Sequence, residues 1–122
     1  MGNFEKHIKL AKEKLKSTKD AFTKKSNTVV GDLAVKVVEQ LIEADVSKKG
    51  EHFGDHKSRH EYSNKEFPEI VNNAMRKIWF AYGDLGYDGV NGNRARIVME
   101  NLKLIIKFFK KRFKVKIDEQ NT

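Results

Sequence analysis

Apolar residues recur along the chain at steps of three and four positions, the spacing of an amphipathic α-helix. This pattern fills four segments, and the alternation typical of strands is nearly absent. The first expected helix runs from about Asn3 to Lys25. Its apolar seam consists of Phe4, Ile8, Ala11, Leu15, Thr18 and Phe22. Because this seam is narrow, most of the helix should face water.

The second expected helix has the strongest apolar pattern in the chain. Its apolar face consists of Val30, Leu33, Ala34, Val37, Val38, Leu41 and Ile42. The helix should end near Ser47, because Lys48 and Lys49 suit the negative end of a helix dipole. Gly50 suits the left-handed conformation that often follows a helix.

The third expected helix begins at Ser63, which forms a capping-box pattern with Glu66. Pro68 is then tolerable, because the first-turn N–H groups of a helix have no helical partner. The apolar face of this helix consists of Phe67, Ile70, Val71, Ala74, Ile78, Ala81 and Tyr82. A tight loop should follow in residues 83–93, which hold four glycines, among them those of an Asp-Gly and an Asn-Gly turn signal.

The fourth expected helix starts after Asn91 or Asn93 and ends near Arg112. Its apolar surface is wider than packing against one adjacent helix requires, which indicates deep burial or a dimer contact. With short connections, the four segments predict an all-α fold: an antiparallel up-and-down bundle of four main helices, with a polar loop between helices two and three. The chain, residues 1–122, should form one domain in which the first and fourth helices are neighbours.

Positive charge is concentrated at the two ends of the chain, which has a net charge of +8. Residues 1–25 carry eight Lys against three acidic residues, and residues 94–117 carry nine Lys or Arg against one. Adjacent end helices would form one basic surface, which favours binding of a nucleic acid or nucleotide. The candidate binding residues are Arg94, Arg96, Lys110, Lys111, Arg112 and Lys114. The alternative is that these Lys-rich faces only keep the helices hydrated.

The stretch KKGEHFGDHKSRHEY, residues 48–62, holds His52, His56 and His60 at intervals of four. On a helix these side chains would form one stripe able to bind zinc. The chain has no cysteine, so any metal would need His, Asp or Glu ligands. Gly54 and the lack of apolar periodicity favour instead a solvated loop between helices, in which the spacing has no geometric meaning. The zinc site, an anion-binding loop and a plain polar connection all remain open.

The layout of two long helices, a polar His-containing loop, a third helix ending AYGDLGYDGVNG and a fourth amphipathic helix resembles the small prokaryotic HEPN-type bundles, above all archaeal stand-alone members. Many proteins of that family are dimeric ribonucleases or toxins that use an Arg, a polar residue and a His near the last long helix. Arg94 and Arg96 lie in that neighbourhood, but no histidine follows His60, and Glu100 and Asn101 stand where it would fall. The resemblance therefore supports the fold and weakens the nuclease interpretation.

We therefore expect a non-catalytic, homodimeric binding protein that engages RNA, a nucleotide or a protein partner through its first and fourth helices. The resemblance adds a nucleotidyltransferase as a partner. The alternatives are a ribonuclease or toxin in which Arg94, Arg96, Glu100 or a histidine of the loop takes the catalytic roles, and a zinc-binding bundle. No apolar run approaches the length of a membrane span, and the N-terminus lacks an apolar signal core, so we expect a cytoplasmic location.

Overall fold

The computed structural model describes the backbone of residues 2–88 and 93–117 and the side chains of residues 3–80 and 93–117. Within these ranges the chain forms five helices and no strand, in agreement with the expected all-α class. The helices are α1 (Gly2–Thr23), α2 (Asn27–Ser47), α3 (His56–Glu66), α4 (Glu69–Asp88) and α5 (Asn93–Phe113).

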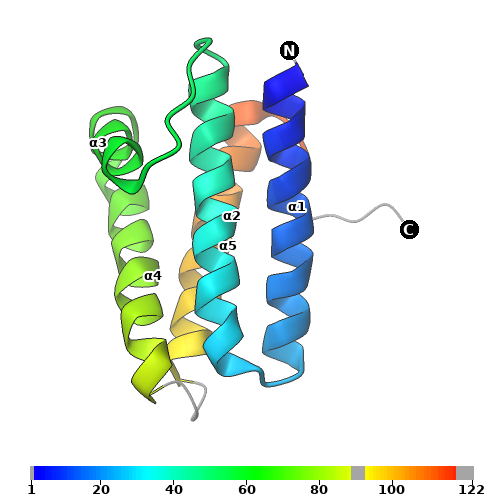
Figure 1. The fold of residues 1–122 in the computed structure, drawn as a ribbon, viewed down its shortest axis with the longest axis vertical. Coiled ribbons are helices and arrows are strands. Elements are labelled where there is room, and N and C mark those ends of the chain that lie inside the picture. The colour runs from blue at the N-terminus through cyan, green and yellow to red at the C-terminus, as the bar shows by residue number, and fades with distance from the viewer. Residues whose placement is uncertain (1, 89–92, 118–122) are drawn as a thin grey trace.

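The long helices form two antiparallel pairs, α1 with α2 and α4 with α5, and α2 also packs against both α4 and α5 (Figure 1). The short α3 lies near the end of the molecule where α2 ends and α4 begins. α2 is the central helix, and its side chains are buried over most of its length. This position explains why α2 has the strongest apolar pattern in the sequence.

The helices do not clearly form the expected four-helix up-and-down bundle. α1 packs mainly along α2, and the expected neighbour contact with α5 is slight. At one end the rings of Phe4 and Phe113 meet edge to face, with centroids 5.0 Å apart. Farther along, the two helices line an open groove. Phe22, which the periodicity places in the apolar seam of α1, is 36% exposed beside this groove.

The prediction that one helix starts at Ser63 is wrong, because the chain forms two helices there. Ser63 lies inside α3, is buried, and its hydroxyl donates a hydrogen bond to the side chain of Asn72 in α4. The break between the helices falls at Phe67, whose backbone is extended with φ −110° and ψ 153°. The ring of Pro68 excludes helical geometry from the residue before it, so proline ends α3 before α4 begins.

The segment read as a non-helical polar loop is helical from His56 onward. The side chain of Asp55 caps α3 by accepting a hydrogen bond from the Ser58 N–H at 2.9 Å. Gly54 precedes this cap in a left-handed conformation, with φ +84°, so it sets the start of the helix instead of preventing one. At the other end of the connection, Gly50, three residues after the end of α2, has φ +76°, the left-handed conformation that the sequence predicts there.

The expected loop at residues 83–93 begins later than the sequence predicts. The helix α4 continues through the glycines of residues 83–88 and ends at Asp88. The rest of the expected turn, residues 89–92, lies outside the described residues. α5 begins at Asn93 and ends at Phe113, close to the predicted bounds.

Candidate functional site

Glu43 is the most unusual residue of the core, a carboxylate on the central helix that is only 1% exposed. One carboxylate oxygen accepts the Phe53 N–H at 3.1 Å, and the other accepts the Gly54 N–H at 3.0 Å and the Arg59 Nε–H at 2.8 Å. Burial acts to raise the pKa of this carboxyl. The two backbone donors and the guanidinium outweigh burial and hold the pKa below its usual value. Glu43 therefore stays ionised and fixes the segment that leads into α3.

Asp45, two residues farther along α2, forms a second buried polar centre. Its carboxylate accepts the Tyr62 hydroxyl at 2.6 Å and the Arg112 Nε–H at 2.5 Å. Burial, followed by the hydrogen bond to Asp45, raises the pKa of Tyr62 to about 12. The hydrogen bond to the same carboxylate raises the pKa of Arg112. Asp45 thus joins α2, α3 and α5 at one end of the molecule, and the predicted anion-binding Arg112 forms an ion pair with it.

The three histidines of the predicted zinc stripe contact three different partners. Nδ1 of His52 lies 3.2 Å from a Glu43 oxygen, Nδ1 of His56 lies 3.0 Å from a Glu39 oxygen, and the ring of His60 packs on Trp79 with centroids 4.7 Å apart. His56 and His60 occupy successive turns of α3, whereas His52 lies in the connection before it. The stripe therefore does not form one ligand set.

His56 and His60 do share a cavity between α2, α3 and α4, with a volume of about 330 Å³. Its lining consists of Asp32, Val35, Lys36, Glu39, His56, His60 and Trp79. Burial, together with the nearby His56, lowers the pKa of His60. His60 is therefore neutral near pH 7 and packs on Trp79 as an uncharged ring.

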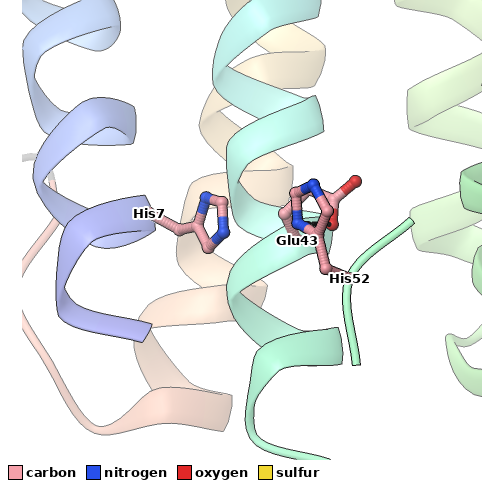
Figure 2. A group of neighbouring side chains, drawn as sticks. All are labelled: His7, Glu43 and His52. Atoms are coloured by element: carbon pink, nitrogen blue, oxygen red, sulfur yellow. Dashed lines mark ion pairs between the residues drawn. The ribbon is translucent and has the colours of Figure 1, made fainter. Parts of the chain in front are cut away.

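Among the described side chains, one group of metal-ligating residues brings its ligand atoms within 4.8 Å of one another: His7, Glu43 and His52. Figure 2 shows the His7 ring pointing from α1 toward Glu43 of α2 and His52 of the following connection. Sequence reasoning missed His7 and Glu43, because the three residues come from three separate elements. The acidic Glu43 beside the apolar face of α2 was the one available signal.

A groove of about 440 Å³ runs between α1 and α5. Its lining consists of Leu15, Lys19, Phe22, Arg96, Met99, Glu100, Leu102, Lys103 and Ile106. Two sequence candidates, Arg96 and Glu100, thus face the same space.

The predicted basic residues fall into two clusters on α5. Arg94 and Arg96 lie in its first turn, whereas Lys110, Lys111 and Arg112 lie in its last turn and Lys114 directly follows the helix. Fifteen residues separate Arg96 from Lys111, which corresponds to about 22 Å along a helix. The six residues therefore do not form one compact patch.

None of the helices, over the residues described, is both long and apolar enough to cross a membrane. Comparison of the chain with protein-family models, curated proteins and solved structures gave no match.

Proposed function

We propose that the protein is a non-catalytic binding protein that engages single-stranded RNA in the groove between α1 and α5. The observation that supports this function is the composition of the groove. Both helices contribute cationic side chains to it, Lys19 from α1 and Arg96 and Lys103 from α5, around apolar walls. A nucleotide presents the matching chemistry, an anionic phosphate beside a base with an apolar face.

The apolar part of the groove favours an unpaired strand over a duplex. The partly exposed ring of Phe22 lies beside the cationic groups and offers a face for a base. Stacking of a base on an aromatic side chain contributes about 1–3 kcal/mol, and only an unpaired base can reach such a ring. Three cations against the single acid Glu100 leave the groove with a positive charge that attracts the backbone.

The second basic cluster extends this surface along α5. Lys110 and Lys111 lie about 22 Å from the groove end marked by Arg96, and Lys114 follows them. A strand that leaves the groove along α5 would meet these cations. Arg112 contributes less, because its guanidinium is paired with Asp45.

The groove predicts a salt-dependent affinity that its own cations control. If three cations neutralise three phosphates, the logarithm of the affinity falls with the logarithm of salt with a slope of about −2, from ~0.7 per phosphate in single strands. Raising salt from 50 to 200 mM should then weaken binding roughly 20-fold. In the variant that combines Lys19→Gln, Arg96→Gln and Lys103→Gln, the slope of log affinity against log salt should become less negative by about 2. Fluorescence anisotropy of a labelled mixed-sequence RNA measures both quantities.

The matched control removes the same net charge elsewhere. Lys57, Lys65 and Lys77 are exposed on α3 and α4, outside the groove. Changing all three to Gln should leave most of the affinity and slope intact. Phe22→Ala should weaken binding without changing the slope, because stacking releases no counterions. Equal losses in the two triple variants, or a flat salt response, would contradict the groove as the binding surface.

A second candidate function is RNA cleavage, which the shared position of Arg96 and Glu100 in the groove favours. It retains the HEPN interpretation, with Arg94 as a further catalytic candidate. Cleavage requires turnover of the labelled RNA that disappears in Arg96→Ala, and intact RNA after prolonged incubation would exclude it. The homodimer and the nucleotidyltransferase partner stay predictions, which size-exclusion chromatography and co-purification test.

A further inference from the structure

His7, Glu43 and His52 form a potential metal site at the end of the molecule away from the groove. His7 and the groove residue Lys19 are twelve positions apart on α1, about 18 Å along the helix. The three side chains converge from α1, α2 and the connection before α3. The first observation is therefore that folding brings together three side chains of two types, imidazole and carboxylate, that bind zinc in proteins.

The separation of two ligand atoms fits a tetrahedral metal. Nδ1 of His52 lies 3.2 Å from Oε1 of Glu43. Zinc binds imidazole nitrogen at about 2.0–2.1 Å and carboxylate oxygen at about 2.0–2.2 Å, so two tetrahedral ligands stand about 3.4 Å apart. A metal can thus lie between these two atoms at their present spacing. The rings of His7 and His52 stack with centroids 5.8 Å apart and 13° between their planes, so at least one ring turns about its side-chain bonds when both bind the same ion.

The third ligand is oriented by a hydrogen bond of its own. Nδ1 of His7 lies 2.7 Å from Oε1 of Gln40, one turn before Glu43 on α2. An amide oxygen only accepts, so this bond requires the proton on Nδ1, and in the neutral ring the lone pair is then on Nε2. Metal-binding histidines commonly donate their second ring nitrogen to an oxygen in this way, which fixes the ring and its tautomer. The bond to Gln40 is a second observation, independent of the clustering.

Glu43 is prepared as an anionic ligand. The N–H groups of Phe53 and Gly54 and the Arg59 guanidinium hold its carboxylate in one orientation. Oε2 accepts two of these donors, whereas Oε1 accepts one from the backbone and faces His52 with its remaining lone pair. A metal would bind Oε1 alone, and the other donors would support it from behind.

We infer that Nε2 of His7, Oε1 of Glu43 and Nδ1 of His52 bind one zinc ion. Two imidazoles and one carboxylate suit zinc better than magnesium or calcium, which prefer oxygen ligands. The side chain of His52 is 62% exposed, so the fourth position opens to solvent and takes water or an exogenous ligand. This site shares no residue with the groove, so its test does not depend on the proposed RNA binding.

Calorimetric titration of the untagged, chelator-treated full chain with zinc chloride tests the site. One zinc should bind per chain, and His7→Ala and His52→Ala should each weaken binding at least 100-fold. Both side chains are at least partly exposed, so neither change removes a core residue. Gln40→Ala removes only the supporting hydrogen bond and should weaken binding about 10- to 100-fold. Circular dichroism confirms that each variant folds.

His56→Ala is the matched control, because it removes an exposed histidine of the same segment that pairs with Glu39 instead. Its zinc affinity should equal that of the unchanged chain. Loss of zinc binding in His56→Ala would indicate that His52, His56 and His60 bind the metal, and it would overturn the inference. Binding that survives His7→Ala, or no saturable binding at millimolar zinc, overturns it as well. An unchanged affinity in Gln40→Ala overturns Nε2 as the ligand atom of His7.

Discussion

Replacing Glu43 by Gln should lower the free energy of unfolding by about 3 kcal/mol, the scale expected when one partner of a buried ion pair is removed. The side-chain volume hardly changes, so packing is preserved. The guanidinium of Arg59, whose side chain is 13% exposed, loses its closest counter-charge. The amide also has one acceptor oxygen for the donors that the carboxylate now satisfies, so a buried donor is left without a partner.

Urea unfolding followed by circular dichroism measures this loss, and pH identifies its origin. The pKa of Glu43 is lowered in the folded protein. The folded state therefore binds fewer protons than the unfolded state, and stability rises with pH across this window. The contribution of Glu43 is complete above the usual carboxyl pKa and is lost as the pH falls through the folded value. The difference in the free energy of unfolding between the unchanged protein and Glu43→Gln should consequently become smaller as the pH is lowered.

Glu13→Gln provides the control, since it makes the same chemical change at an exposed position of α1. Its effect should stay within about 0.5 kcal/mol, as for most surface substitutions. If both variants lost equal stability, or if the deficit of Glu43→Gln stayed constant at all pH values, the charge of Glu43 would not be what holds the segment before α3.

Phe109→Ala should lower the free energy of unfolding by about 4 kcal/mol, within the range for truncating a buried aromatic residue. The side chain is 0% exposed, and its ring centroid lies 5.2 Å from those of Phe67 and Phe113 and 5.1 Å from that of Phe108. Truncation leaves a cavity among three rings and removes edge-to-face contacts as well as buried area.

Phe80→Ala makes the same change on α4 at a residue that is 76% exposed, and should cost less than about 0.5 kcal/mol. Chemical unfolding of the unchanged protein, Phe109→Ala and Phe80→Ala under the same conditions gives both differences in the free energy of unfolding. A loss in Phe109→Ala comparable to that in Phe80→Ala would contradict the position of Phe109 in the core. Because natural domains of this kind unfold with only about 5–15 kcal/mol, the core change should be visible as a large fall in the urea midpoint.

Most of the burial in the long helices follows their apolar spacing, although Ile70, placed by that spacing in the apolar face of α4, is 63% exposed. α2 illustrates this: its predicted stripe is buried except for the partly buried Leu33, it ends at Ser47, and Gly50 takes the left-handed conformation. α3 shows the limit of the method. Its sequence has almost no apolar periodicity, and polar contacts hold it in place: the cap by Asp55 and the bonds of Arg59 and Tyr62 to acids of α2. Periodicity does not detect a helix held in that way.

The candidate sites depend on pairings that the sequence order hides. Arg112 reads as one more cation in a basic run, yet its partner Asp45 lies 67 positions earlier and is buried. His7 has no neighbour in sequence that marks it as a ligand, and only the packing of α1 on α2 brings it to Glu43. In contrast, Arg96 and Glu100 share a groove because they are one helical turn apart, which their spacing already implied.

The way α1 is attached has a consequence for how the molecule opens. This helix rests mainly on α2, through a narrow seam that includes the small residues Ala11, Thr18 and Ala21. Because α2 is the one helix that α1 contacts extensively, opening of α1 would leave the contacts among α2, α4 and α5 in place, and we expect its amide hydrogens to exchange below the global unfolding free energy. That opening would remove one wall of the groove and one ligand of the proposed zinc site together. A molecule bound at either place would therefore hold α1 closed and favour binding at the other.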